Sequence, residues 1–316
     1  MVKIMALMIL QVFLFGISSL TAHDGVHIDV DRVTKEIKAS EDPGPLYLLR
    51  ARLCRAHGRP ELGLQDLQMA RGCGVDPFAE KLERALCLRD SLKTQQALRL
   101  LDELAATPGN TAMEVFNERS AIRESMGDID GAIIDLARIH ALVPDLEKTL
   151  RLGMLYEKRK APGIAAALYR KMIERNGESA LLSISLIRAE TDNGHYDAAL
   201  SLVAGKLRQA GLKAPWLQRK AEILQAAGRD AEAASALKEA LKELDVIFKR
   251  RPVPIHRVTR ARILRLLGRL EEARGELEKV LQQAPGYGSA RRELNLVLEL
   301  QEAAKSTEQK PEPDSP

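Results

Sequence analysis

The residues Asp128, Asp130 and Gly131 lie in the stretch GDIDGA and have the spacing with which many calcium-binding loops begin. A calcium loop between two helices needs oxygen ligands at its first, third and fifth positions, glycine at the sixth and a bidentate Glu at the twelfth. Counted from Asp128, the fifth position is Ala132 and the twelfth is Ile139. The stretch therefore predicts no calcium site, and its acids and glycines need another explanation.

Sequence motifs for catalysis are also missing. The chain contains no G-x-S-x-G nucleophile turn, no H-E-x-x-H zinc motif and no glycine-rich phosphate loop. The strongly basic stretch 249–269 has no aromatic residues, whereas single-stranded nucleic acid is usually bound by cations together with stacking aromatic side chains. We therefore expect a protein that is not an enzyme, with no cofactor and no nucleic-acid partner.

The first residues have the layout of a secretory signal peptide. Lys3 is followed by an apolar run over 4–17 and then by small and polar residues that end at Ala22. The run is only slightly shorter than a membrane-spanning helix, so an uncleaved anchor is the alternative. We expect an exported protein, periplasmic or secreted, from which the signal peptide (1–22) is removed.

Cleavage after Ala22 would leave His23 as the first residue of the mature chain. The amine and imidazole of His23, together with His27, could supply three nitrogen ligands to copper. This arrangement resembles the histidine brace of lytic polysaccharide monooxygenases, but the sequence shows nothing of their fold. We expect no metal ion, with copper binding through His23 and His27 as the less favoured alternative.

A repeat of about 34 residues runs through most of the chain. Phrases similar to GDIDGAIIDL begin at positions 58, 92, 127, 160, 194, 228 and 268, with spacings of 34, 35, 33, 34, 34 and 40. Apolar residues make up 45% of the chain and are mostly Leu, Ala and Ile, which favours helices over strands. Units of this length bury their apolar faces by stacking on one another.

These copies resemble the tetratricopeptide repeat, a pair of antiparallel helices with small residues near positions 8 and 20 and glycine near position 15. The twentieth positions here are Gly63, Ala97, Ala132, Ala165, Ala199, Ala233 and Ala273. Under this interpretation Gly127 ends one helix, and Asp128 or Asp130 begins the next. The chain departs from the family pattern at Leu92, Lys160, Ile187 and Lys206.

The resemblance implies an all-α fold, an α-solenoid (right-handed superhelix) of about seven helix pairs over 44–285. We expect an N-terminal segment and capping helix over 23–43, because terminal repeats otherwise expose their core. A C-terminal capping helix is expected over 286–305 and a disordered tail over 306–316. The six extra residues between repeats six and seven predict a longer second helix in repeat six.

In this family the concave surface comes largely from the first helix of each pair. Carried onto this chain, the resemblance implies a partner-binding groove that is basic at both ends and acidic between. Its residues would be Arg52, Arg55, Arg89, Glu114, Asn117, Glu124, Glu147, Glu157, Arg188, Glu222, Arg262 and Arg265. The alternative is a merely solvated surface, with the partner bound elsewhere.

The function that follows is a non-catalytic scaffold that binds a protein or peptide partner in this groove. The alternative of another class is an envelope assembly or export subunit that contacts an anionic polysaccharide, and a copper protein is a third. The identity of the partner and the oligomeric state stay open.

The three cysteines, Cys54, Cys73 and Cys87, do not have the spacing of a metal site. Cys54 and Cys87 fall at equivalent levels of adjacent first helices, so they are the one plausible disulfide pair. Packed helix axes lie about 8–10 Å apart, which makes that bond geometrically doubtful. Buried free thiols are the favoured interpretation.

Overall fold

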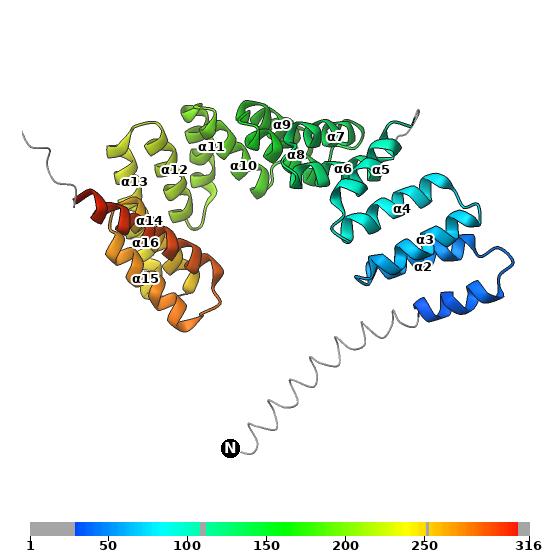
Figure 1. Cartoon of the computed structure of the whole chain (residues 1–316). Helices are drawn as coiled ribbons and strands as arrows, with labels where there is room; N and C mark the ends of the chain where they lie inside the picture. Colours follow the sequence, from blue (N-terminus) through cyan, green and yellow to red (C-terminus); the bar gives the residue numbers. More distant parts are fainter. Residues whose placement is uncertain (1–28, 108–111, 251–252, 309–316) are drawn as a thin grey trace, which may run out of the picture. The chain divides into compact units, whose positions relative to one another are not determined.

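The computed structural model describes residues 29–107, 112–250 and 253–308, and all regular secondary structure in them is α-helical (Figure 1). The chain divides into two compact units between Arg159 and Lys160. The first unit contains a helix over 29–39, α2 (Gly44–Ala56), α3 (Pro60–Gly72), α4 (Pro77–Asp90), α5 (Thr94–Ala105), α6 (Met113–Ser125), α7 (Ile129–Leu142) and α8 (Leu146–Lys158). The second contains α9 (Pro162–Asn176), α10 (Ala180–Asp192), α11 (Tyr196–Gln209), α12 (Ala214–Ala226), α13 (Asp230–Arg250), α14 (Pro254–Leu266), α15 (Leu270–Gln283) and α16 (Gly288–Glu308).

Three predictions concern residues outside this described part of the chain. They are the signal peptide over 1–22, the copper ligands His23 and His27, and most of the tail over 306–316. Among the described residues, no helix combines the length and the apolar character that crossing a membrane requires.

The predicted helix pairs are present in both units. In the first unit α2 packs on α3, α4 on α5 and α6 on α7, and in the second α10 packs on α11, α12 on α13 and α14 on α15. Ala51 and Ala85 of the first helices and Ala97 and Ala132 of the second helices are fully buried. Because these side chains are small, the two backbones of a pair can approach closely. Leu101, also fully buried, then fills the space toward the next repeat.

The turn inside each pair is closed by a residue in the left-handed conformation. Gly58 and Gly127 have φ angles of 67° and 83°. Leu92 and Lys160, which stand where the family has glycine, keep this conformation with φ angles of 60° and 64°. A left-handed conformation costs a residue with a Cβ roughly 1–2 kcal/mol. At Leu92, the packing of α4 on α5 therefore overrides the local preference of the residue.

The stretch GDIDGA starts a helix. Asp128 is the N-cap of α7, and its carboxylate accepts a hydrogen bond of 2.9 Å from the backbone N–H of Gly131. A Cβ atom on Gly131 would clash with that carboxylate, so the glycine leaves room for the cap. Asp130 instead forms an ion pair with Arg159 at 2.6 Å. Asp128 therefore caps a helix, and Asp130 is one partner of a surface ion pair.

The ends and the long insert also agree with the expectations for the fold. The helix over 29–39 contributes Val33 and Ile37 to the core. α13 runs over 21 residues, which is the lengthened second helix predicted from the extra residues. The closing helix α16 packs on α14 and α15 and buries Val297 completely.

The fifth repeat accommodates both of its departures from the family pattern. Ile187 is 1% exposed and packs in a cluster with Ala199 and Val203. Lys206 places its ammonium 2.5 Å from Glu178, so its charge is paired although most of the side chain is covered. A long side chain therefore fits at a position where the family prefers a small one, because its charged end reaches a partner.

Two repeats contain a buried ion pair between their own helices. Arg50 of α2 binds Asp66 of α3 through two hydrogen bonds of 2.6 and 2.9 Å. Arg119 of α6 binds Asp135 of α7 in the same way, at 2.5 and 2.9 Å, and the Asp135 side chain is 1% exposed. Bidentate arginine–aspartate pairs of this kind fix the relative positions of two helices. These charges therefore stabilise the fold and are not available to a partner.

Candidate functional site

Charged side chains on the first helices connect adjacent repeats, and we call this set the inter-repeat ladder. In each pair, a residue near the end of one first helix meets the opposite charge in the first half of the next first helix or of the closing helix. The pairs are Arg55–Glu83, Arg89–Glu118 and Glu124–Arg151 in the first unit, and Arg265–Glu293 in the second. The partners are 27 to 29 residues apart with opposite signs, a sequence signal that could have revealed them.

The arginines predicted for the basic end of the first unit are ladder members or their neighbours. Arg55 Nε lies 2.5 Å from Glu83, and Arg52 Nε lies 3.6 Å from the other oxygen of the same carboxylate. The Glu83 side chain is only 5% exposed. Arg89 pairs with Glu118 and with a neighbouring aspartate. These cations neutralise acids of the protein itself, which reduces the positive charge that the surface offers to a partner.

The second unit shows the same neutralisation. Arg262 and Arg265 share the buried carboxylate of Glu293 at 3.2 and 2.6 Å. Glu222 forms an ion pair with Arg219 at 3.2 Å and also accepts a hydrogen bond from Gln218 at 2.9 Å. Arg188, on α10, is exposed.

Two of the residues predicted for the middle of the groove also have partners within the protein. Asn117 accepts a hydrogen bond of 3.0 Å from Arg151, which joins α6 to α8. Glu124 lies 2.5 Å from the ammonium of Lys158. Glu157 is half-buried.

Two of the predicted acids remain available together with apolar neighbours. Glu114 and Glu147 are exposed, and neither has a hydrogen-bond or ion-pair partner among the described residues. Met113, Leu146 and Met154 are exposed on the same two helices, α6 and α8. We call these five residues the acidic–apolar strip. Because it combines uncompensated carboxylates with flexible apolar side chains, it suits a basic amphipathic segment.

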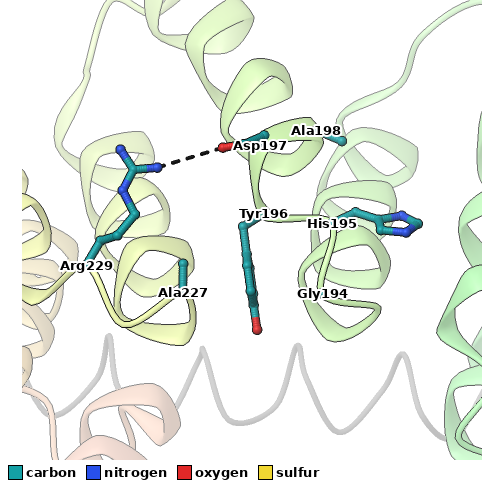
Figure 2. A pocket seen from close by; sticks show the side chains of 7 residues that line it. All are labelled: Gly194, His195, Tyr196, Asp197, Ala198, Ala227 and Arg229. Carbon is teal, nitrogen blue, oxygen red and sulfur yellow. Dashed lines mark ion pairs between the residues drawn. The ribbon is translucent and has the colours of Figure 1, made fainter.

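A cleft of about 470 Å³ lies between the turn joining α10 to α11 and the turn joining α12 to α13. Figure 2 shows the Tyr196 ring standing between these two turns, with His195 directed away from it. Arg229 lies 3.8 Å from Asp197 and 2.7 Å from Glu232. Since its charged groups are paired with one another, this cleft offers no free charge to a ligand.

His195 has a structural partner. Its Nδ1 lies 2.9 Å from Glu190, a carboxylate that is 1% exposed and also pairs with Arg170. A buried carboxylate needs such partners, so the imidazole and guanidinium satisfy Glu190. In the part of the chain that the structure describes, no group of three or more His, Cys, Asp or Glu side chains is placed to hold a metal ion.

The three cysteines are free, with Cys54 and Cys87 buried and Cys73 exposed. Burial raises the pKa of the Cys87 thiol to about 12, and burial also raises the pKa of Cys54. Both groups are therefore protonated at neutral pH and are poor nucleophiles. The structure agrees with buried thiols rather than with a disulfide.

The chain matches no protein-family model, and no curated protein matches it either. It is similar in structure to a tetratricopeptide repeat protein from Parabacteroides merdae, with 17% identity, 81% of this chain and 98% of that chain covered and a TM-score of 0.49. It is also similar to the C-terminal part of a TPR repeat-containing protein from Cytophaga hutchinsonii, with 14% identity, 86% and 95% of the two chains covered and a TM-score of 0.50. The second of these similarities, together with the packed helix pairs, identifies the fold as the tetratricopeptide-type helical solenoid that the repeats predicted.

Proposed function

We propose that this chain of tetratricopeptide fold is a non-catalytic scaffold that binds a protein or peptide partner through its first helices. The observation that carries this proposal is the acidic–apolar strip on α6 and α8. Glu114 and Glu147 have no partner within the described residues, and Met113, Leu146 and Met154 on the same helices leave 40–49% of their surface exposed. A surface of this kind is a feature that the fold itself does not require.

The chemistry of the strip indicates the kind of partner. Two uncompensated carboxylates attract Lys or Arg side chains, while Met113, Leu146 and Met154 offer apolar contact. A basic amphipathic segment, presented as a helix or an extended chain, meets both requirements. The same carboxylates would repel a polyanion, which argues against an anionic polysaccharide at this position.

The cellular setting of the proposal rests on the sequence. The apolar run over 4–17 and the small residues that end at Ala22 are typical of a signal peptide. We therefore place the scaffold in the cell envelope or outside the cell.

The experiment compares charge reversal inside the strip with a matched reversal outside it. The strip variant is Glu114→Lys with Glu147→Lys, and the control is Glu41→Lys with Glu174→Lys, two exposed acids that change the net charge equally. Each protein is used as bait in envelope extracts, and bound proteins are quantified by mass spectrometry. Melting curves check folding, because an acid in the first turn of a helix adds a few tenths of a kcal/mol.

We expect a set of proteins retained by the wild type and the control but lost from the strip variant. Retention of the same set by the strip variant would show that the strip is not the binding surface. Recovery of glycan without protein would favour the polysaccharide alternative instead.

A further inference from the structure

A second candidate binding surface lies on second helices of the repeats, whereas the acidic–apolar strip lies on first helices. A cleft of about 550 Å³ lies between the second helices α3 and α5, with α4 beneath it. Its floor includes the apolar side chains of Leu64, Leu88 and Leu100. The whole cleft lies within the first unit and shares no residue with the acidic–apolar strip.

The charge of this cleft is positive and uncompensated. The side chains of Lys93 and Arg99 are exposed, and neither has an ion-pair or hydrogen-bond partner among the described residues. The other charged residues of the cleft are satisfied by the protein. Arg84 Nε binds Glu80 at 2.8 Å, and Glu103 binds Lys81 at 2.8 Å. Two free cations therefore remain, which favours an anionic ligand.

The rest of the lining favours a peptide over a compact anion or a sugar. Gln65 and Gln68 on α3 and Gln96 on α5 present side-chain amides with no partner in the described part of the chain. An amide side chain both donates and accepts, so it can pair with the N–H and C=O groups of an extended backbone. The leucine floor can hold an apolar side chain, whereas no aromatic ring lines the cleft for a sugar to stack on.

This combination is specific to one junction of the solenoid. The positions of Lys93 and Arg99 in the second repeat correspond to Asp128 and Ile134 in the third. The first of these is an acid that caps α7, and the second is an exposed apolar residue. A basic residue recurs at the position of Lys93 in three other repeats, as Arg59, Arg229 and Arg269, but Arg99 has no basic counterpart in any of them. The pair of cations is thus particular to this cleft.

We infer that the cleft between α3 and α5 binds an acidic, extended peptide segment of a partner protein. The peptide carboxylates meet Lys93 and Arg99, and its backbone meets the glutamine amides. An apolar side chain of the peptide enters the space above Leu64 and Leu100. The two surfaces of the chain thus select segments of opposite charge.

The test measures binding of labelled peptides to the full chain by fluorescence anisotropy at two salt concentrations. The probes are a capped nonapeptide of alternating Glu and Leu, a Lys–Leu peptide of the same length, and heparin as a non-peptide polyanion. The cleft variant is Lys93→Gln with Arg99→Gln. The matched control is Lys35→Gln with Lys38→Gln, which removes two exposed cations from the helix over 29–39.

The cleft variant should bind the Glu–Leu peptide roughly fivefold to tenfold more weakly than the wild type, with the control unchanged. Gln96→Ala keeps all charges and should still weaken binding about threefold, because it removes amide contacts. Glu114→Gln with Glu147→Gln should leave this binding unchanged, so the result is independent of the proposed function.

Three outcomes would overturn the inference. They are no binding of the Glu–Leu peptide to the wild type, equal losses in the cleft variant and the control, and heparin binding that depends on the same two cations while Gln96→Ala has no effect. The last result would identify a general anion surface rather than a peptide site.

Discussion

Arg55 Nε lies 2.5 Å from Oε1 of Glu83, and this contact connects the first helix of one repeat to the first helix of the next. Glu83 is almost completely buried, so its charge depends on the arginine. From the sequence alone, Arg55 is predicted to be a groove residue whose charge is available to a partner. Its role in stacking changes how the groove should be tested, because reversing its charge would disturb the fold as well as any partner.

The first prediction concerns this ion pair. Arg55→Met should lower the free energy of unfolding by about 2 kcal/mol, because it leaves a buried carboxylate with one weaker partner. Arg55→Met combined with Glu83→Leu should recover part of this loss. Urea unfolding followed by circular dichroism gives the coupling energy, expected to be about 1 kcal/mol or more. Strictly additive effects of the two substitutions would contradict a stabilising contact.

The second prediction concerns the left-handed turns. Leu92 is 88% exposed and has a φ of 60°, so Leu92→Gly should relieve strain without losing packing. We expect the free energy of unfolding to rise by about 0.5–1 kcal/mol. Gly58→Ala is the matched control, since a Cβ there meets no atom within 4 Å and should cost about 1 kcal/mol by conformation alone. Destabilisation by Leu92→Gly would show that the leucine has a role beyond the turn.

The third prediction separates the two aspartates of GDIDGA. Asp128→Ala removes the cap of α7 and should lower the free energy of unfolding by about 1 kcal/mol, while Asp128→Asn should largely preserve it. Asp130→Ala breaks only an exposed ion pair and should change stability by less than about 0.5 kcal/mol. Thermal melts with and without calcium complete the experiment. A calcium-dependent rise in Tm that Asp128→Ala abolishes would restore the metal interpretation.

The fourth prediction concerns thiol reactivity. Iodoacetamide should modify Cys73 first in the folded protein, with Cys54 and Cys87 at least roughly tenfold slower, because they are buried and their pKa values are raised. Peptide mapping by mass spectrometry after timed labelling measures the three rates. Comparable rates at Cys87 and Cys73 would show that the first repeats open readily.

The raised pKa of Cys87 also predicts a pH dependence of stability. The folded thiol has a pKa of about 12 against an ordinary value of 9.0, so the unfolded chain loses this proton at lower pH. The free energy of unfolding should therefore be unaffected below pH 9 and fall as pH rises from 9 toward 12, by about 1.4 kcal/mol per pH unit at most. Cys87→Ala should show a shallower fall over the same window, and identical slopes would contradict the shift.

The helix pairs could be predicted because their signals are local and repeated. Ala97 and Ala132 mark close contacts, and Gly58 and Gly127 mark turns at a constant spacing, so each copy supports the others. Leu92 and Lys160 lack the glycine signal but adopt its conformation, and at Leu92 the packing of α4 on α5 dictates the turn. The repeat pattern also left Asp128 and Asp130 as alternative starts of α7, and only the position of the Gly131 N–H decided between them.

The candidate binding surfaces could be predicted only in part. The sequence correctly predicted that Arg55, Arg89 and Arg265 lie on first helices. It did not show that each of these arginines is paired with a glutamate of the next helical unit. The sequence does not indicate the cleft with Lys93 and Arg99, because the family resemblance places binding residues on the first helices and this cleft lies mainly between two second helices.

The sequence by itself determined the repeat period, the helix pairs and the positions of their turns, because these depend on residue size and backbone preference within about 34 residues. The tertiary structure decided which charges hold the stack together and which remain for a partner. Glu114 and Arg55 both stand at predicted groove positions, but Arg55 has Glu83 of the next repeat within hydrogen-bonding distance and Glu114 has no such partner among the described residues. That difference arises from the distances between stacked helices, which no single repeat encodes.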